Sequence, residues 1–449
     1  MKILLVQPPY NSQTVGGNNF YIPEPLALET IGASVTNHNV KLLDMRLEPN
    51  LLETLKQFQP DIVGTTSYTP EVYRAQGILK QVKDFNKEIL TVIGGHHATL
   101  IPGDFNKEYI DIVVIGEGDI TFRELTDAYE KKGDLRKING LAIRQKNGEI
   151  FLTQPREMVL NLDNAPVPRR SLTQNYREQY FRLIWRPVAS MMTSRGCPFR
   201  CNFCSIWKHE HGKYRARSAE SVMNELLTIN EKYVSISDDN FLQDAARLEK
   251  LYHLIKQSGI KKSYKIITRS DSVVRSSKLI EQWKEIGLSE VTLGLESFRD
   301  NELKSLNKNN TVQKNSEAIK IVKDNGISLT GHFIINQNYM KEDFEALKEY
   351  IYKTGLNHPM FTVLTPLPMT DYYNEMKSQL LTKNYEMYDL VHSVLPTKLP
   401  REIFYEYYSD LYYDIYIKNN KNNSQEVEFF NNIVKNICTG LKNSYQLLN

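Results

Sequence analysis

Three of the chain's four cysteines lie close together, in the stretch RGCPFRCNFC from Arg195 to Cys204. Cys197, Cys201 and Cys204 are separated by three and then by two residues. Thiolates bind zinc and iron–sulfur clusters, and both kinds of site usually have four protein ligands. A group of three therefore predicts a metal centre with one open position, which a substrate or a cofactor can occupy.

A zinc site is the first alternative for these cysteines. The nearest histidines are His209 and His211, but the resulting C-x3-C-x2-C-x4-H spacing is not a usual zinc pattern. The fourth cysteine, Cys438, is distant in the sequence and is expected to be an ordinary thiol. We therefore predict a 4Fe–4S cluster whose fourth ligand does not come from the protein.

Strand-like and helical stretches alternate around the cysteines. Residues 187–369 contain six strand-like runs separated by amphipathic stretches, and the first run, PVASMMTS, ends at the cysteines. Glycines follow several of the predicted helices, as is typical of helix C-termini. Six β/α units predict a partial barrel, two units short of a closed one. The cysteines then fall at the carboxyl end of a strand, where such barrels have their active sites.

Residues 1–135 show the same alternation with five strand-like runs. Continuous apolar runs such as ILLV and DIVVI are typical of strands covered on both faces. We predict a doubly wound α/β domain that binds its ligand at the carboxyl ends of the strands. The GxGxxG fingerprint of dinucleotide-binding domains is absent. QPPYNSQ, after the first strand, lacks the acidic pair of a response regulator.

The remaining segments complete an α/β fold class with a helical carboxyl-terminal domain. Residues 136–186 are expected to be a connector, with a hairpin around Asn147-Gly148 followed by extended, proline-containing chain. Residues 370–449 are rich in tyrosine, leucine and asparagine and predict a helical cap. Its tyrosines are expected to pack on the barrel, the alternative being that one or two line a substrate pocket.

The composition excludes several classes of protein. The 449 residues carry a net charge of only +3, and the scattered basic residues give no nucleic-acid or polybasic membrane site. Apolar runs are shorter than the roughly 18–20 residues of a membrane span. The start of the chain does not resemble a signal peptide. Bunched cysteines make a poor disulfide framework, which favours reduced thiols and a cytoplasmic location.

The CxxxCxxC motif after the first strand of a partial barrel resembles the signature of radical S-adenosylmethionine (SAM) enzymes. The resemblance implies that Cys197, Cys201 and Cys204 hold the cluster and that the methionyl amine and carboxylate of SAM chelate the open iron. Reductive cleavage of SAM then gives a 5′-deoxyadenosyl radical, which abstracts hydrogen from a substrate. A reductant such as flavodoxin or ferredoxin is the implied protein partner.

The resemblance also assigns cofactor contacts to other residues. Phe203 is expected to pack near the adenine of SAM, the alternative being ordinary packing. Asp238 and Asp239, in SDDNF after the second strand, fall where family members bind the methionyl amine, often through a GGE-like segment. Arg269 is expected to reach the methionyl carboxylate as a bidentate donor, and Glu296 to bind the ribose hydroxyls. The alternative for the last two is that they are solvated loop charges.

The amino-terminal domain, the barrel and the helical tail together resemble the cobalamin-dependent radical SAM family. The likeness is greatest to the branch with the oxygen-independent magnesium-protoporphyrin cyclase and the hopanoid methylases. It is carried by VIGGHHAT, VIGEGDITF, TSRGCPFRCNFC, TLGLES and TPLPMT. It implies that Ser67, Gly94 and Gly95 hold the dimethylbenzimidazole tail of cobalamin, since glycine permits close approach of a flat ring.

The DxHxxG motif that supplies a cobalt-binding histidine in other cobalamin domains is absent after the first strand. We therefore expect no protein histidine below the cobalt. We interpret His96 and His97 of VIGGHHAT as polar loop residues, the alternative being that one of them contacts cobalamin. Tyr68 or Thr69 is the candidate to face the cobalt. Gly116 and Glu117, after the fifth strand, are expected at the same edge or in a plain turn.

The resemblance implies a methyltransferase that moves a methyl group from methylcobalamin to an unactivated carbon of a small-molecule substrate. Such C–H bonds are not acidic enough for a general base, so a radical is needed. The alternatives are an oxidative cyclase or ring-rearranging enzyme without methyl transfer, and a non-catalytic cobalamin sensor or carrier. Formation of S-adenosylhomocysteine would distinguish a methyltransferase from a cyclase or ring-rearranging enzyme. Cleavage of SAM would distinguish an enzyme from a non-catalytic sensor or carrier.

Overall fold

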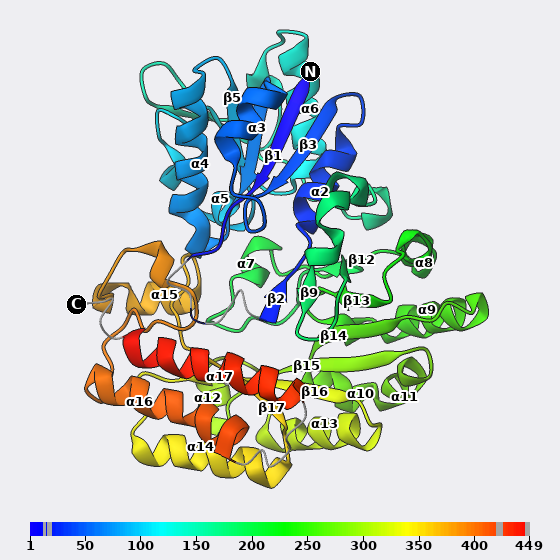
Figure 1. Ribbon diagram of the computed structural model, residues 1–449, viewed down its shortest axis with the longest axis vertical. Coiled ribbons are helices and arrows are strands. Elements are labelled where there is room, and N and C mark those ends of the chain that lie inside the picture. Colours follow the sequence, from blue (N-terminus) through cyan, green and yellow to red (C-terminus); the bar gives the residue numbers. More distant parts are fainter. Residues whose placement is uncertain (12–14, 16–19, 419–424, 445–449) are drawn as a thin grey trace. The chain divides into compact units, whose positions relative to one another are not determined.

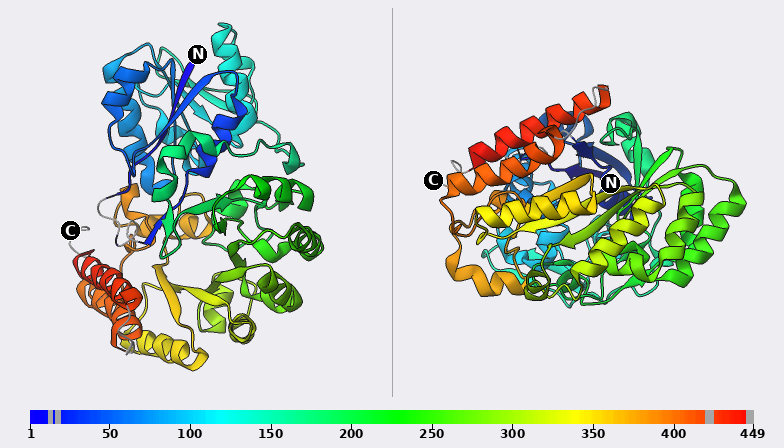
Figure 2. Two further views of the ribbon diagram at one scale, coloured as in Figure 1. Left: turned by 45° about the vertical axis from the view of Figure 1, so that its right-hand side comes forward. Right: turned by 90° about the horizontal axis from the view of Figure 1, so that it is seen from below.

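The computed structural model describes residues 1–11, 15, 20–418 and 425–444. The chain forms two compact units. Unit 1 comprises Met1–Ser12 and Pro23–Tyr180, and unit 2 comprises Gln13–Ile22 and Phe181–Asn449. Figures 1 and 2 show a sheet with helices in each of them.

Unit 1 is a doubly wound α/β domain, as predicted. Its seven-stranded sheet has the order β3-β1-β4-β5-β6-β7-β8, in which the first five strands are parallel. α2 packs with α6 and α3 with α4, and four residues of β1, from Ile3 to Val6, are at most 1% exposed. The elements are β1 (Lys2–Gln7), α2 (Leu26–Ser34), β3 (Asn39–Asp44), α3 (Leu51–Phe58), β4 (Ile62–Thr66), α4 (Val72–Phe85), β5 (Leu90–Gly94), α5 (His96–Leu100), β6 (Ile112–Val114), α6 (Gly118–Glu130), β7 (Leu141–Arg144) and β8 (Ile150–Leu152).

The hairpin predicted in the connector extends the sheet of unit 1. β7 pairs antiparallel with β6, and β8 pairs with β7 across the turn at Asn147-Gly148. Gly148 has a φ of +87°, a conformation that favours glycine. The compact units divide at Tyr180, so most of residues 136–186 belong to unit 1. The four domain ranges given above stay a prediction.

Unit 2 contains the predicted partial barrel. Its six strands are all parallel and follow the order β10-β13-β14-β15-β16-β17, with β10 and β17 at the two ends of an open sheet. The strands are β10 (Val188–Met191), β13 (Tyr233–Ile236), β14 (Ser263–Arg269), β15 (Leu288–Glu296), β16 (Ser328–Ile335) and β17 (His358–Val363). The helices are α8 (Ala219–Thr228), α9 (Ala245–Ser258), α10 (Ser270–Arg275), α11 (Ser277–Glu285), α12 (Asp300–Ser305), α13 (Val312–Asp324) and α14 (Lys341–Thr354).

Local sequence signals fix the ends of the barrel helices. The side chains of Ser218, Asp244 and Thr311 accept backbone N–H groups at the starts of α8, α9 and α13. Gly259 and Gly355 end α9 and α14 in the left-handed conformation. Helices follow each of the first five strands and return along the outer face of the sheet (Figure 2).

The two faces of the barrel strands differ in polarity. In β15, Val291, Leu293 and Leu295 alternate with Glu290 and Thr292, because successive side chains of a strand point to opposite faces. The three apolar residues join the main core with the outer helices. The barrel is therefore held together from outside, and its inner face carries polar side chains.

The carboxyl-terminal segment covers the free edge of β17. α16 (Arg401–Tyr412) packs against α14 and α17 (Gln425–Ser444) and continues into a π-helical turn over Tyr413–Lys418. The hydroxyl groups of Tyr408 and Tyr416 donate to the backbone oxygens of Phe361 and Pro359, each at 2.7 Å. The tyrosines therefore close an exposed strand edge, as the prediction that they pack on the barrel requires.

Replacing Tyr408 by phenylalanine is expected to destabilise unit 2 by about 1 kcal/mol, the usual value of a buried hydrogen bond. Scanning calorimetry of the full chain should show a melting temperature lower by about 2–4 °C. Tyr413→Phe is the control, because this ring is 47% exposed. Equal melting temperatures for the two variants would contradict the edge-closing role.

Candidate active site

The cysteine loop follows β10 at the carboxyl end of the barrel sheet. β11 (Ser194–Arg195) pairs with β12 (Arg215–Ala216), and the loop then turns at Gly196, whose φ is +84°. A Cβ at Gly196 would lie 2.1 Å from the backbone oxygen of Lys213, so only glycine fits the turn. The four cysteines of the chain are all free thiols.

The three thiols of the loop suit a cluster better than a single ion. Cys201 is buried, and all three thiols lie close enough for their charges to interact. Burial raises the pKa of Cys197, and it raises the pKa of Cys204 to about 12. In the described part of the chain, no three His, Cys, Asp or Glu side chains converge on one ion. A 4Fe–4S cluster needs no such convergence, because each thiolate binds a different iron.

A buried carboxylate after β13 holds the cysteine loop in place. The Asp238 carboxylate accepts hydrogen bonds from the backbone nitrogen of Thr193 at 2.6 Å, the Thr193 hydroxyl at 2.5 Å and the Ser194 hydroxyl at 2.6 Å. Asp239 accepts from the backbone nitrogen of Gly196 at 2.8 Å, and burial raises its pKa to about 6. Both aspartates thus position the loop, and their predicted contact with the methionyl amine stays a prediction.

Arg269 ends β14 and lies against the same loop. Its guanidinium is 3.5 Å from the centre of the Phe199 ring, and Nη1 is 3.9 Å from the Cys201 sulfur. Nε donates to Asp271 at 2.8 Å and Nη2 donates to the backbone oxygen of Lys308 at 2.7 Å. Arg269 is 5% exposed, so it is not a solvated loop charge. It places a fixed positive charge beside the thiols.

Glu296 ends β15 in an unusual backbone conformation. Its φ is +64°, and the strand register shifts between Gly294 and Glu296. A non-glycine residue in this region costs of order 1–3 kcal/mol and is common at functional sites. The Glu296 carboxylate accepts a hydrogen bond from the Lys308 ammonium at 2.6 Å. It is buried and faces this edge, and its predicted contact with ribose stays untested.

Phe203 has an apolar neighbourhood inside unit 2. It packs against a small cluster formed by Leu306, Ile334 and Leu364. Ordinary packing therefore accounts for part of its surface, and the adenine contact stays a prediction.

Several residues of this site were not singled out by sequence reasoning. Phe199 and Lys308 contact Arg269, and Asn240 accepts a hydrogen bond from the Arg269 backbone nitrogen at 3.2 Å. Asn240 lies in the SDDNF segment, so its position after the second barrel strand could have identified it from the sequence. Lys308 comes from the stretch after α12 and had no such signal.

The carboxyl edge of unit 1 brings together the residues predicted to bind cobalamin. β4, β5 and β6 are neighbours, so the loops after them meet at one edge. The backbone nitrogen of Ser67 donates to Gly94 at 3.1 Å, and Gly116 donates to the Thr99 hydroxyl. Strand order reverses between β1 and β4, which is where doubly wound sheets bind ligands.

Ser67 is the residue here whose chemistry calls for a ligand. Its hydroxyl is fully buried and has no hydrogen-bond partner within the described residues. Space is open beside Gly116, whereas a Cβ at Gly95 would lie 2.3 Å from the Thr66 hydroxyl. Glu117 accepts a hydrogen bond from the backbone nitrogen of Val159 at 3.0 Å. The edge fits a group that brings its own hydrogen-bond donor or acceptor to Ser67.

The two histidines of VIGGHHAT have partners inside unit 1. The buried His97 ring lies 3.0 Å from the Thr69 hydroxyl and 3.0 Å from the Asp104 carboxylate. His96 stacks on Tyr68, with ring centres 5.9 Å apart. Tyr68 is 62% exposed and Thr69 is buried. The interpretation of these histidines as loop residues is wrong, because both lie in the short helix α5. Both ring nitrogens of His97 have partners within unit 1.

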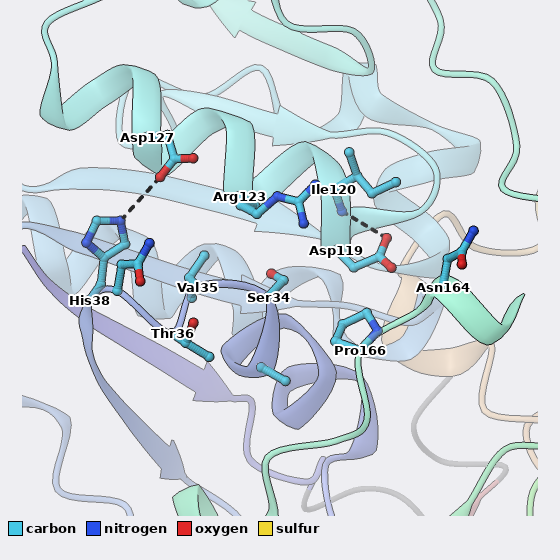
Figure 3. Close-up of a pocket in the computed structure, with 12 residues that line it drawn as sticks. Ser34, Val35, Thr36, His38, Asp119, Ile120, Arg123, Asp127, Asn164 and Pro166 are labelled. Atoms are coloured by element: carbon cyan, nitrogen blue, oxygen red, sulfur yellow. Dashed lines mark hydrogen bonds and ion pairs between the residues drawn. The ribbon is translucent and has the colours of Figure 1, made fainter. Parts of the chain in front are cut away.

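A cavity of about 270 Å³ lies elsewhere in unit 1 (Figure 3). It is formed by the end of α2, the segment before β3 and one side of α6, and His38 lies 3.9 Å from Asp127 at its wall. None of the residues predicted to bind cobalamin lines it. It is a separate feature from the carboxyl edge of the sheet.

The sequence matches two family models. The Radical SAM superfamily model covers residues 191–351, and the B12 binding domain model covers residues 13–126. These ranges contain the cysteine loop and the Ser67 edge respectively. The fold and the site therefore define a radical SAM enzyme with a cobalamin-binding domain.

The similar proteins narrow this class to a family. The chain is 33% identical to an uncharacterized methyltransferase of Pyrococcus horikoshii, over 89% of this chain and 88% of the relative. It is 30% identical to the hopanoid C-3 methylase of Methylococcus capsulatus, over 90% of this chain and 78% of the relative. The solved structure of OxsB with aqua-cobalamin and SAM bound has a TM-score of 0.72 at 18% identity, over 98% of this chain and 71% of that chain, and shows the shared fold.

The chain belongs to the cobalamin-dependent radical SAM methyltransferase family. The resemblance to the hopanoid methylase branch is thereby confirmed, and so is the predicted fold class. The cofactors of the family are a 4Fe–4S cluster, SAM and cobalamin, as predicted.

Replacing Asp238 by alanine is expected to loosen the cysteine loop. It removes three hydrogen bonds to a charged acceptor, each of which contributes about 1.5–3 kcal/mol. Iron and sulfide per chain after anaerobic reconstitution should fall well below the wild-type content. The control is Asp324→Ala, whose carboxylate is 61% exposed and pairs with Lys320. Wild-type cluster content in both variants would contradict the positioning role.

Proposed function

We propose that this protein is a C-methyltransferase that transfers a methyl group from cobalamin to an unactivated carbon of a small-molecule substrate. One observation carries the proposal. A loop of three free thiols, one buried and two partly buried, stands at the carboxyl end of a barrel with a polar inner face. Methyltransferases are among the proteins to which the chain is similar.

The residues that would hold each cofactor follow from the site. Cys197, Cys201 and Cys204 would bind the cluster, and the Ser67 edge of unit 1 would bind cobalamin. When bound, the cluster and SAM supply a hydrogen-abstracting radical, and methylcobalamin supplies the methyl group. Arg269 keeps a positive charge beside the thiols, and this charge favours the ionised form of Cys197.

Several hydrogen bonds around the cysteine loop hold it in place. Asp238 fixes the start of the cysteine loop, and Trp207 donates to the backbone oxygen of Cys201 at 2.9 Å. The Lys308 ammonium donates to Glu296, and the backbone oxygen of Lys308 accepts a hydrogen bond from Arg269. The loop is thus restrained by residues at the carboxyl ends of β13 and β14, as a site that must hold one geometry requires.

A separate reductant and a reducing compartment complete the proposal. Cleavage of SAM consumes an electron, so we infer a reductant partner such as flavodoxin or ferredoxin. Free thiols at all four cysteines support a cytoplasmic location. Among the described residues, no helix is both long and apolar enough to cross a bilayer.

Cluster-dependent methylation has a product pattern that tests the proposal. The reconstituted, reduced enzyme should form both 5′-deoxyadenosine and S-adenosylhomocysteine, measured by mass spectrometry. Cys201→Ala should lose cluster and 5′-deoxyadenosine together, whereas Cys438→Ala should keep both, because Cys438 lies in the tail and donates to Ser409. 5′-Deoxyadenosine without S-adenosylhomocysteine would favour a cyclase or ring-rearranging enzyme. Absence of SAM cleavage would favour a cobalamin carrier.

Cobalamin retention tests the role of unit 1. The full chain should retain about one cobalamin after desalting, measured by its absorption spectrum. Ser67→Ala removes a hydroxyl that has no protein partner, so it should weaken hydroxocobalamin binding about two- to tenfold. Ser289→Ala, in the barrel unit, is the control. Unchanged affinity of Ser67→Ala would exclude a contact between this hydroxyl and cobalamin.

A further inference from the structure

The inner face of the barrel has the polarity of a binding surface. In filled barrels, the inward positions are mainly valine, isoleucine and leucine. Here one register row across neighbouring strands includes Ser235, Lys265 and Glu290. The next row on the same face includes Thr292 and Thr330 beside Ile267. Parallel neighbours in register project to the same face of the sheet. A barrel filled by its own side chains would not place these polar groups together.

The negative charges of this inner face already have partners. Arg182 forms a bidentate ion pair with Glu290, which also accepts a hydrogen bond from Thr330 at 3.3 Å. Nearer the carboxyl edge, Glu296 pairs with Lys308. Each carboxylate is therefore neutralised by a cation other than Lys265.

Lys265 is buried without a partner. It is 6% exposed and has no hydrogen bond or ion pair within the part of the chain described. Its neighbours Tyr264 and Ile266 belong to the outer core, so the Lys265 side chain lies on the inner face. Its pKa is lowered to about 7, mainly by burial and also by the charge of Arg182, against the opposing effect of Glu290. An isolated buried ammonium is unfavourable, so this position is suited to an incoming anion.

Two hydroxyl groups near Lys265 are also unsatisfied. The Ser235 and Thr292 hydroxyls are buried and lack hydrogen-bond partners among the described residues. They come from β13 and β15, the strands on either side of β14. Buried hydroxyls are normally hydrogen-bonded, so these two groups and Lys265 point to a polar ligand. His332 faces the same space, and burial lowers its pKa to about 4, which keeps the ring neutral.

The depth of Lys265 separates it from the cysteine loop. It precedes Arg269 by four residues on the extended strand β14, a distance of about 13 Å at 3.3 Å per residue. A ligand group that reaches Lys265 therefore lies well below the level at which Arg269 contacts Cys201.

We propose that the interior of the barrel binds the substrate through an anionic group, a carboxylate or a phosphate, that pairs with Lys265 and accepts hydrogen bonds from Ser235 and Thr292. This inference rests on the proposed function and names the substrate class: a polar molecule with an anionic end. It predicts that a pure hydrocarbon is not the substrate, in spite of the similarity to a hopanoid methylase.

Lysine reactivity in the full-length, cluster-reconstituted enzyme tests the site without turnover. Trace acetylation over neutral to alkaline pH, read for each lysine by mass spectrometry, gives both rate and pKa. Acetate represents a carboxylate and inorganic phosphate a phosphate, while ethanolamine and glycerol are the cationic and neutral controls. Lys320, which is 74% exposed, is the internal reference.

The expected result is protection of Lys265 by an anion. Acetate or phosphate at about ten times its dissociation constant should slow the labelling of Lys265 about tenfold and leave Lys320 unchanged. The pKa of Lys265 should rise by about 1–3 units, as for a charge that gains an opposite partner. If acetate protects Lys265 at the lower concentration, the anionic group of the substrate is a carboxylate. If phosphate does so, the group is a phosphate. Acetate and phosphate should raise the melting temperature of the wild type and of Lys320→Met. They should not raise the melting temperature of Lys265→Met.

Three results would overturn the inference. They are equal labelling of Lys265 with and without both anions, equal protection by ethanolamine, and protection by SAM alone, which would assign the lysine to the cofactor. The labelling uses the unmodified protein, so it decides the matter even if Lys265→Met does not fold. S-adenosylhomocysteine formation tests methyl transfer separately, so failure of either proposal can be recognised by itself.

Discussion

The hydrogen bonding of one buried carboxylate underlies the geometry of the active site. Asp238 is 1% exposed, and a carboxylate in such a place is tolerated only when its oxygens are satisfied. Thr193 and Ser194 provide the donors, and both lie at the start of the cysteine loop. The energy that burial of this charge requires is therefore offset only while the loop keeps its place beside β13.

A second constraint is the division of the barrel into an apolar outer face and a polar inner face. The outer face gains stability from helices such as α13 and α14, whose apolar residues join one continuous core. Because this core lies outside the sheet, the inner face need not be packed for stability. Charged pairs such as Arg182 with Glu290 can then occupy it, and an unpartnered lysine is tolerated there.

The carboxyl-terminal segment protects the edge of the open barrel sheet. An open barrel ends in a strand with free backbone groups, which in many proteins invites association with another chain. Here Tyr408 and Tyr416 bind those groups through their hydroxyls, while the Tyr408 ring lies in the core and the Tyr416 ring packs against it. The aromatic composition of residues 370–449 thus serves the barrel edge, and the open side of the sheet needs no further strand.

The sequence by itself determined the cofactor chemistry and the order of elements. Cysteine spacing is a local property of the chain, and so is the alternation of apolar runs with amphipathic stretches, which predicted six parallel strands. Only the tertiary structure decided what the charged residues contact. Asp238 and Arg269 have partners 44 to 68 positions away in the sequence, Thr193, Ser194 and Cys201 among them, and no local pattern encodes such distances. The isolation of Lys265 is likewise a property of three neighbouring strands, because a side chain lacks a partner only in relation to everything packed around it.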